Sequence, residues 1–208
     1  MFFVFEGVDG AGKSTQIKLF AQWLKDQGHD IVACNDPGST ELGEQIRSIL
    51  LGNHKIPISM RAEMMLFTTA RTQLVEQIIK PALNQGQSVV LDRYIFSTVV
   101  YQGHAGALNP DELWSINRIA TSGTMPDMTF ILDLPVATAM DRLGSTLDRM
   151  ESRGAEYFEL VRNGFLTEAE RWPEGVEVID ATQTPENMQT EIRKLASQAI
   201  IRNTKSQA

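Results

Sequence analysis

Five short apolar runs are spread along the chain, and between them lie longer segments in which apolar residues recur every three or four positions. A short apolar run is typical of a strand buried on both faces of a parallel sheet, whereas the three- and four-residue spacing is typical of an amphipathic helix. Strands that alternate with helices predict parallel βαβ crossovers, and therefore a three-layer α/β fold with a five-stranded parallel sheet flanked by helices. The predicted strands are 2–5, 31–34, 88–91, 128–133 and 176–180, and the predicted helices are 16–24, 42–51, 60–83, 97–102, 110–121, 136–143, 155–172 and 185 onward.

Helix-breaking and helix-capping residues predict some of the helix boundaries. The long helical pattern from Met60 is expected to stop near Pro81 and Gly86, and Asn109 is the expected cap of the helix at 110–121. A chain of 208 residues, 42% of them hydrophobic, is large enough to bury one good core. We therefore expect residues 1–208 to form one domain.

The segment between the first predicted strand and the first predicted helix reads GVDGAGKST and fits the phosphate-loop pattern G-x-x-x-x-G-K-[ST]. Its glycines permit positive φ, so that backbone N–H groups and the helix N-terminus surround a phosphate chain. A chance glycine-rich turn is the alternative, but motif and context agree. The sequence thus predicts a P-loop NTPase fold. The predicted phosphate contacts are Gly7, Val8, Asp9, Gly10, Ala11, Gly12, Lys13, Ser14 and Thr15.

Lys13 is the residue that would reach the β- and γ-phosphates, and the Ser14 hydroxyl would ligate Mg²⁺. Asp92 directly follows the third predicted strand, at the sheet edge where ligands of such folds bind, and we expect it to hold Mg²⁺ as well. A residue that merely caps the next turn is the alternative for Asp92. The adjacent Arg93 favours the functional interpretation, because it would serve a second phosphate.

Three arginines, Arg142, Arg149 and Arg153, surround a short polar segment at about 142–154, which we call the lid segment. An ordinary solvated charge run is one interpretation. Phosphoryl transfer is the other, because the charge on the migrating group must be neutralised while water is excluded. Phe67 and Arg71 lie four residues apart and share a helix face. As a pair they could stack on a nucleotide base and bond its edge, but Phe67 could equally be a core residue and Arg71 a solvated one, and periodicity does not decide between these interpretations.

The net charge of −7 argues against a broad surface for nucleic acid or an anionic membrane, because basic patches hold such partners. The single Cys34 cannot form a disulfide within the chain, and its place in a predicted strand favours a core residue over a reactive thiol. A first strand that begins at Phe2 leaves no room for a signal peptide, and no apolar run approaches the length of a membrane span. We expect a soluble cytoplasmic protein with surface histidines at His29, His54 and His104.

Several separated motifs together make the sequence resemble the bacterial thymidylate kinases, essentially from end to end. No single later motif would be convincing, but their order and spacing are specific. The motifs are GVDGAGKST at 7–15, DPGST at 36–40, LFTTAR at 66–71, LDRYIFSTVVYQG at 91–103, PDMTFILDLP at 126–135, LDRME at 147–151 and VRNGFL at 161–166.

The resemblance implies phosphorylation of dTMP to dTDP by ATP in dTTP synthesis, with Mg²⁺ as cofactor and a homodimer as the assembly. It implies catalytic roles for Asp9, Lys13, Arg93 and Arg149, and contacts of Arg142 and Arg153 with the ATP phosphates. Phe67 would stack on thymine, Arg71 and Thr98 would read its polar edge, and Arg93 with Arg47 would hold the acceptor phosphate. The residues assigned to dTMP are Asp9, Asp36, Arg47, Phe67, Arg71, Arg93, Ser97, Thr98, Tyr101 and Gln102.

Within this family, some members carry an arginine inside the phosphate loop and others carry it in the lid. Gly10 and Ala11 occupy the loop interior here, so the chain resembles the type with a lid arginine. It departs from the family pattern R-E-P-G-G-T at Asn35 and Asp36, where a positive charge is lost and the carboxylate sits on a shorter arm.

Two other functions stay open from the residues. A kinase of the same architecture for another nucleoside monophosphate or a small metabolite differs in its base pocket, at residues such as Phe67 and Arg71. A nucleotide-dependent switch or binding module is the second alternative. Against it, the sequence contains no N-K-x-D guanine-specificity motif.

Overall fold

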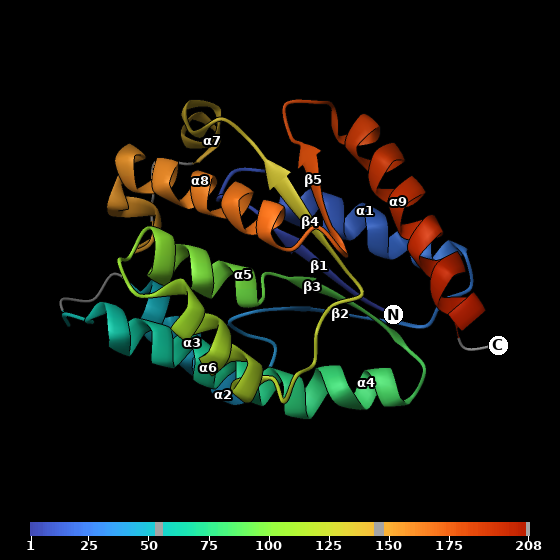
Figure 1. Ribbon diagram of the computed structural model, residues 1–208, viewed down its shortest axis with the longest axis horizontal. Helices are drawn as coiled ribbons and strands as arrows, with labels where there is room; N and C mark the ends of the chain where they lie inside the picture. The colour runs from blue at the N-terminus through green and yellow to red at the C-terminus, as the bar shows by residue number, and fades with distance from the viewer. Residues whose placement is uncertain (53–55, 144–147, 207–208) are drawn as a thin grey trace.

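The computed structural model describes residues 1–52, 56–143 and 148–206 (Figure 1). In these residues the strands form one parallel sheet in the order β2-β3-β1-β4-β5. The predicted five-stranded parallel sheet with flanking helices is confirmed. Its strands are β1 (Phe2–Glu6), β2 (Ile31–Asn35), β3 (Ser88–Asp92), β4 (Met128–Asp133) and β5 (Val176–Asp180).

Helices cover both faces of the sheet. On one face α1 contacts β1, β2 and β3, and α9 contacts β4 and β5; the two helices lie side by side in Figure 1. On the other face α4 contacts β3 and α8 contacts β4 and β5, with α2, α3 and α6 further out. The helices are α1 (Lys13–Asp26), α2 (Glu41–Leu51), α3 (Met60–Leu74), α4 (Lys80–Asn84), α5 (Ile95–Thr98), α6 (Pro110–Ala120), α7 (Val136–Arg142), α8 (Ala155–Arg171) and α9 (Pro185–Ser206). Shorter segments are the π-helical η1 (Val75–Ile79) and η2 (Val99–His104) and the 3₁₀ turn η3 (Glu151–Arg153).

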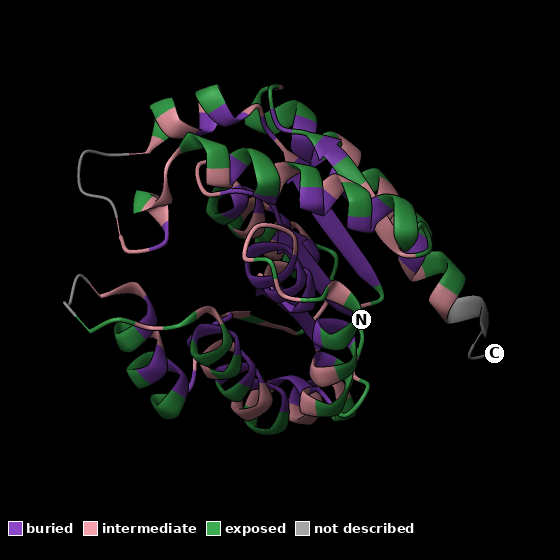
Figure 2. Ribbon diagram, turned by 60° about the vertical axis from the view of Figure 1, so that its left-hand side comes forward, coloured by how far each residue is buried: buried purple, intermediate pink, exposed green. Residues whose placement is uncertain are grey.

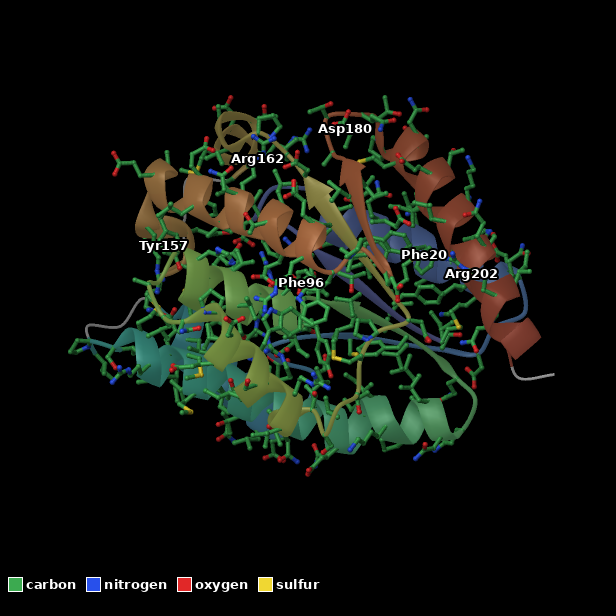
Figure 3. All side chains as sticks on the ribbon, viewed as in Figure 1. Phe20, Phe96, Tyr157, Arg162, Asp180 and Arg202 are labelled. Carbon is green, nitrogen blue, oxygen red and sulfur yellow. The ribbon has the colours of Figure 1, made fainter. Side chains whose placement is uncertain are left out.

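Strand β1 lies at the centre of the core because its side chains alternate between two apolar layers. Phe3 and Phe5 meet Phe20 of α1, at ring-centroid distances of 5.1 and 5.5 Å, whereas Phe2 meets Tyr94 on the opposite face at 5.2 Å. Figure 2 shows the central strands buried, and Figure 3 shows Phe20 beside the sheet. Each such phenylalanine contributes about 1.5–3 kcal/mol through burial. This packing fixes the strand end from which the phosphate loop begins.

The long helix expected over 60–83 is one helical run made of α3, η1 and α4, and it ends at Asn84. Pro81 lies inside this run, which ends two residues before Gly86 and so close to the predicted end at 83. A proline inside an α-helix lacks an N–H donor and its ring meets the carbonyl four residues earlier. The π-helical turn η1 ends two residues before Pro81 and changes the hydrogen-bonding register there, so the proline lies in the first turn of α4, where it is tolerated.

The helix predicted at 97–102 is also longer, and runs through α5 and η2 from Ile95 to His104. It packs closely against α8, where a Cβ on Gly164 would lie 2.9 Å from His104 Cβ. Asn109 caps α6 as predicted, since its side chain accepts from the N–H groups of Asp111 and Glu112. Residues 53–55, between α2 and α3, and residues 144–147 of the lid segment lie outside the described residues.

Candidate active site

Many of the predicted functional residues meet at the carboxyl edge of the sheet. The phosphate loop follows β1, Asp36 follows β2, and Asp92 and Arg93 stand at the end of β3. The strand register sets Phe5 beside Asp92, and Asp92 beside Asn35. Parallel strands end at the same edge, so three loops distant in sequence converge on one site.

The phosphate loop takes the shape that only glycine allows. Gly7 and Gly10 have φ of 130° and 83°, and a Cβ at either residue would lie 2.5 Å from a backbone oxygen, of Leu132 or Ala139 respectively. Lys13 is buried and donates to Gly7 O at 3.0 Å and Val8 O at 2.9 Å. Burial lowers the pKa of this lysine.

A cavity of about 380 Å³ opens over the loop. It is lined by most of the predicted phosphate contacts, but Gly7, Val8 and Ala11 are not among its lining residues. Val8 and Ala11 are buried in the core instead, at 2% and 1% exposure. The cavity is lined by Asp9, Gly10, Gly12, Lys13, Ser14, Thr15, Asn35, Asp36, Arg47, Asp92, Arg93, Arg142 and Glu151.

The two predicted Mg²⁺ ligands, Ser14 and Asp92, line this same cavity. Among the described residues, Asp92 Oδ1 is one of the buried oxygens that lack a hydrogen-bond partner. Mg²⁺ prefers oxygen ligands, and is commonly held by only one or two protein oxygens together with water and substrate phosphates. A hydroxyl and an unpartnered carboxylate oxygen at a phosphate cavity therefore fit this ion.

Asp9 and Arg93 join the phosphate loop to the end of β3. Asp9 Oδ1 lies 2.5 Å from Arg93 Nη2, and Tyr101 donates its hydroxyl to Asp9 Oδ2 at 3.2 Å. The Arg93 guanidinium lies over the Tyr101 ring, 5.2 Å from its centroid. Burial tends to raise the pKa of Asp9, but the charges of Arg93 and Lys13 outweigh it and lower that pKa to about 2.

Glu6, at the end of β1, is a site residue that we did not predict. Arg93 has a φ of 66°, which is strained for a residue with a side chain, and Glu6 holds the turn that follows. Its fully buried carboxylate accepts from Tyr94 N at 2.7 Å, Ser97 N at 3.2 Å and Ser97 Oγ at 2.6 Å. Burial raises the pKa of Glu6, and the Arg93 charge opposes that effect. A charged residue at the end of an otherwise apolar strand was the available signal.

Arg71 is fully buried, at 1% exposure, so the solvated interpretation of this residue is wrong. Its Nε donates to Asp36 Oδ2 at 2.5 Å, and its Nη1 donates to Thr98 Oγ1 at 2.8 Å and to Asn117 Oδ1. Within the described residues Nη2 has no hydrogen-bond partner. The buried Asp36 Oδ1 also lacks one. A donor group and an acceptor are thus left at the wall of a cavity.

Asn117, on α6, is a second residue that sequence reasoning missed. Its Nδ2 donates to Leu113 O at 2.8 Å, which turns Oδ1 toward Arg71. Asn117 is fully buried and lies four residues after the buried Leu113. A polar residue on the apolar face of a helix was the signal.

All ten residues that the resemblance assigns to dTMP line one cavity of about 180 Å³. This acceptor cavity shares part of its wall with the phosphate cavity. The shared residues are Asp9, Asp36, Arg47, Arg93 and Glu151. The acceptor cavity is lined by Asp9, Asp36, Pro37, Arg47, Leu51, Phe67, Arg71, Arg93, Ser97, Thr98, Tyr101, Gln102, Asp148, Met150 and Glu151.

The three lid arginines lie in two different places. Arg142 lines the phosphate cavity, and its Nη1 donates to Gly10 O at 3.4 Å. Arg149 and Arg153 line neither cavity and instead contact Glu63 of α3. The contacts of these two arginines with phosphate therefore stay predictions.

Cys34 and His104 are both partly buried. Burial raises the pKa of the half-buried Cys34 thiol to about 12, so the reactive thiolate is disfavoured. His104 is not a free surface histidine: its Nε2 lies 2.8 Å from Glu168 Oε1 and its side chain is 24% exposed. His29 is half-buried, and His54 lies outside the described residues.

Among the described helices, none has the length and apolar character needed to cross a membrane.

The chain resembles proteins of known family over nearly its whole length. A family model described as thymidylate kinase matches residues 5–192. A thymidylate kinase of Symbiobacterium thermophilum is 42% identical over 203 residues, which cover 97% of this chain and 95% of that protein. One from Exiguobacterium sp. is 43% identical over 194 residues, with 92% of each protein covered.

Among solved structures, the crystal structure of thymidylate kinase from Ehrlichia chaffeensis matches with a TM-score of 0.77 and 29% sequence identity. The match covers 94% of this chain and 98% of that one. Fold, motifs and relatives agree, and the chain belongs to the thymidylate kinase family.

Proposed function

We propose that this protein transfers the γ-phosphoryl group of ATP to dTMP, giving ADP and dTDP on the route to dTTP. The observation that carries the proposal is the pair of adjoining cavities: a phosphate cavity over residues 10 and 12–15 and an acceptor cavity, joined at Asp9 and Arg93. Donor and acceptor phosphates bound in the two cavities would face each other across this shared wall.

On the donor side, Lys13 and the loop N–H groups would hold the ATP phosphates. In the structure the Lys13 ammonium is bonded to the loop carbonyls Gly7 O and Val8 O, so it is already oriented by the loop that would bind phosphate. Ser14 and Asp92 would hold Mg²⁺, which supplies neutralisation of phosphate charge when bound. Arg142, at the rim of the same cavity, adds a further positive charge.

On the acceptor side, Phe67 would stack on thymine while Arg71 Nη2 and the Thr98 hydroxyl donate to its polar edge. The buried bonds of Arg71 to Asp36 and Asn117 fix the guanidinium, so little side-chain entropy is lost when the base binds. Arg93 and Arg47 would hold the acceptor phosphate, and Asp9 with Tyr101 would contact the sugar. Ser97 and Gln102 complete the pocket wall.

The acceptor phosphate is itself a competent nucleophile near neutral pH, so the reaction needs no general base. Positioning of the two phosphates and neutralisation of the migrating charge carry the rate. Asp9 and Arg93 act here, because they line the wall that the two cavities share, and Lys13 acts from the phosphate cavity, where its Nζ lies 3.9 Å from Asp9 Oδ1. Arg149 would add its charge from the lid segment.

The test is release of ADP from ATP and Mg²⁺ with each of dTMP, dUMP, dCMP, AMP and GMP as acceptor. The proposal predicts activity on dTMP well above the other four. Preference for another monophosphate would support the first alternative, a kinase with a different acceptor. Tight nucleotide binding without transfer to any acceptor would support a switch or binding module.

We also propose that the protein works as a homodimer in the cytoplasm. Exposed apolar side chains on neighbouring helices, Leu42 and Ile49 on α2 and Met65 on α3, support an interface there. The single cysteine suits a reducing compartment. Light scattering after size exclusion tests the assembly, because a dimer has twice the chain mass of 23.2 kDa.

A further inference from the structure

Glu63, in the first turn of α3, has a fully buried carboxylate that meets two lid arginines at once. Its Oε2 lies 2.7 Å from Arg149 Nη2 and 2.5 Å from Arg153 Nη2, and the Glu63 side chain is 0% exposed. Glu63 does not line either cavity, so it has no direct role in holding substrate. Its side chain contacts Gln102 of η2 and the two lid arginines.

The other oxygen of Glu63 connects the arginines to the acceptor cavity. Oε1 accepts from Gln102 Nε2 at 2.9 Å, and Gln102 is a lining residue of that cavity. One buried carboxylate thus contacts both a side chain that faces the acceptor and the two arginines of the lid segment.

Each arginine has a second anchor. Arg149 Nε donates to Leu50 O at 2.6 Å, at the C-terminal end of α2, where a helix presents unpaired carbonyls and favours a cation. Arg153 Nη1 donates to the Tyr157 hydroxyl at 2.6 Å, and that hydroxyl donates to Tyr101 O at 2.6 Å. Tyr157, labelled in Figure 3, lies near the start of α8, which packs against η2. These second contacts lie on different elements, α2 for Arg149 and α8 for Arg153, whereas Glu63 is contacted by both arginines.

The charges explain why the carboxylate matters. Two guanidinium groups on one carboxylate leave one positive charge in excess, next to a cavity proposed to take a phosphate. Both arginine side chains are largely buried, at 20% and 18% exposure. Without the Glu63 charge, two like charges would face each other in a poorly solvated site, and at least one arginine would be expelled toward water.

We propose that Glu63 is the positioning residue that holds Arg149 and Arg153 beside the acceptor cavity, so that their charge is in place for phosphoryl transfer. This inference rests on the proposed kinase function. It places the contact that holds Arg149 and Arg153 on α3, outside both substrate cavities, and it assigns to Gln102 the link between Glu63 and the bound acceptor.

The test is the variant Glu63→Gln with two measurements. The first is the kinetic constants for dTMP. The second is the rate at which trypsin cuts the chain after Arg149 and Arg153, with the fragments identified by mass. We expect kcat to fall about 10- to 100-fold, because displaced catalytic groups lose rate at this scale, with a smaller change in KM for dTMP. We expect cleavage after these two arginines to quicken several-fold. Glu41→Gln, an exposed first-turn glutamate of α2, is the matched control and should behave as wild type.

Glu63→Asp keeps the buried charge but shortens the arm, and should show the same pattern if Glu63→Gln folds poorly. In an Arg149→Ala background, Glu63→Gln should lower kcat by a clearly smaller factor than in wild type. Unchanged kcat and cleavage in Glu63→Gln, or the same kcat factor in both backgrounds, would overturn the inference. A wild-type protein inactive on dTMP would refute the proposed function instead, while the cleavage readout would still test Glu63.

Discussion

Asp9 in the phosphate loop and Arg93 at the end of β3 form an ion pair of 2.5 Å that joins the phosphate cavity to the acceptor cavity. Each side chain lines both cavities, and the pair is further tied to Tyr101 by a hydrogen bond and a cation–π contact. The contact therefore stabilises the fold and also sets the position of the two groups proposed to meet dTMP.

This pair predicts a pH dependence of stability. The pKa of Asp9 is lowered to about 2 from 3.8, so its contribution is fully present above about pH 4 and is lost as the pH falls toward 2. The contribution near pH 6 is about 2 kcal/mol. Urea unfolding of wild type and Asp9→Asn should therefore show a difference in unfolding free energy that shrinks between pH 5 and pH 3. A difference that stays constant over this range would show that the Asp9 charge is not what stabilises the fold.

Lys13→Ala should lower turnover about 100- to 1,000-fold, the scale for removing one group that stabilises transition-state charge. The fold should survive, because loss of the ammonium leaves only the Gly7 and Val8 carbonyls without this donor. Lys18→Ala, at an exposed position of the same helix, is the control and should keep wild-type turnover. Near wild-type turnover of a folded Lys13→Ala protein would contradict the role given to this lysine.

Asn117→Leu should raise KM for dTMP about tenfold and leave KM for ATP unchanged. The change removes an acceptor from a buried guanidinium, and hydrogen bonds to charged groups contribute about 1.5–3 kcal/mol. Arg71, which would lose orientation, lines the acceptor cavity and not the phosphate cavity. Ser115→Ala, on the exposed face of the same helix, is the matched control. Equal rises in both KM values would indicate general loosening instead.

Glu6→Gln should destabilise the protein by about 2 kcal/mol or more, because an amide replaces a carboxylate that accepts three hydrogen bonds in the core. The turn that carries Arg93 and Ser97 should loosen with it, so KM for dTMP should rise as well. Urea unfolding and steady-state kinetics measure the two effects, with the exposed Glu174→Gln as control. Loss of stability with an unchanged KM would separate Glu6 from the acceptor site.

The strands and the phosphate loop could be predicted because their signals are local. A strand buried on both faces shows as an apolar run, as in Phe2–Phe5, and the loop geometry demands glycine at Gly7 and Gly10. The order of the strands had no such signal.

For buried polar contacts between residues distant in sequence, no local pattern indicates which residue is the partner. Glu63 lies 90 positions from Arg153, and Glu6 lies 91 from Ser97, so periodicity marks them at most as unusual polar positions. The two π-helical segments escaped prediction because a shifted hydrogen-bond register hardly alters the spacing of apolar residues.

The central claim is that the γ-phosphoryl of ATP reaches dTMP, and transfer of radioactive label tests it most directly. ATP labelled in the γ-phosphate is incubated with Mg²⁺, dTMP and purified protein, and the products are separated. We predict that the label appears in dTDP, that it depends on dTMP, and that Lys13→Ala but not Lys18→Ala abolishes most of it. Label found only in inorganic phosphate, or left in ATP, would contradict the account.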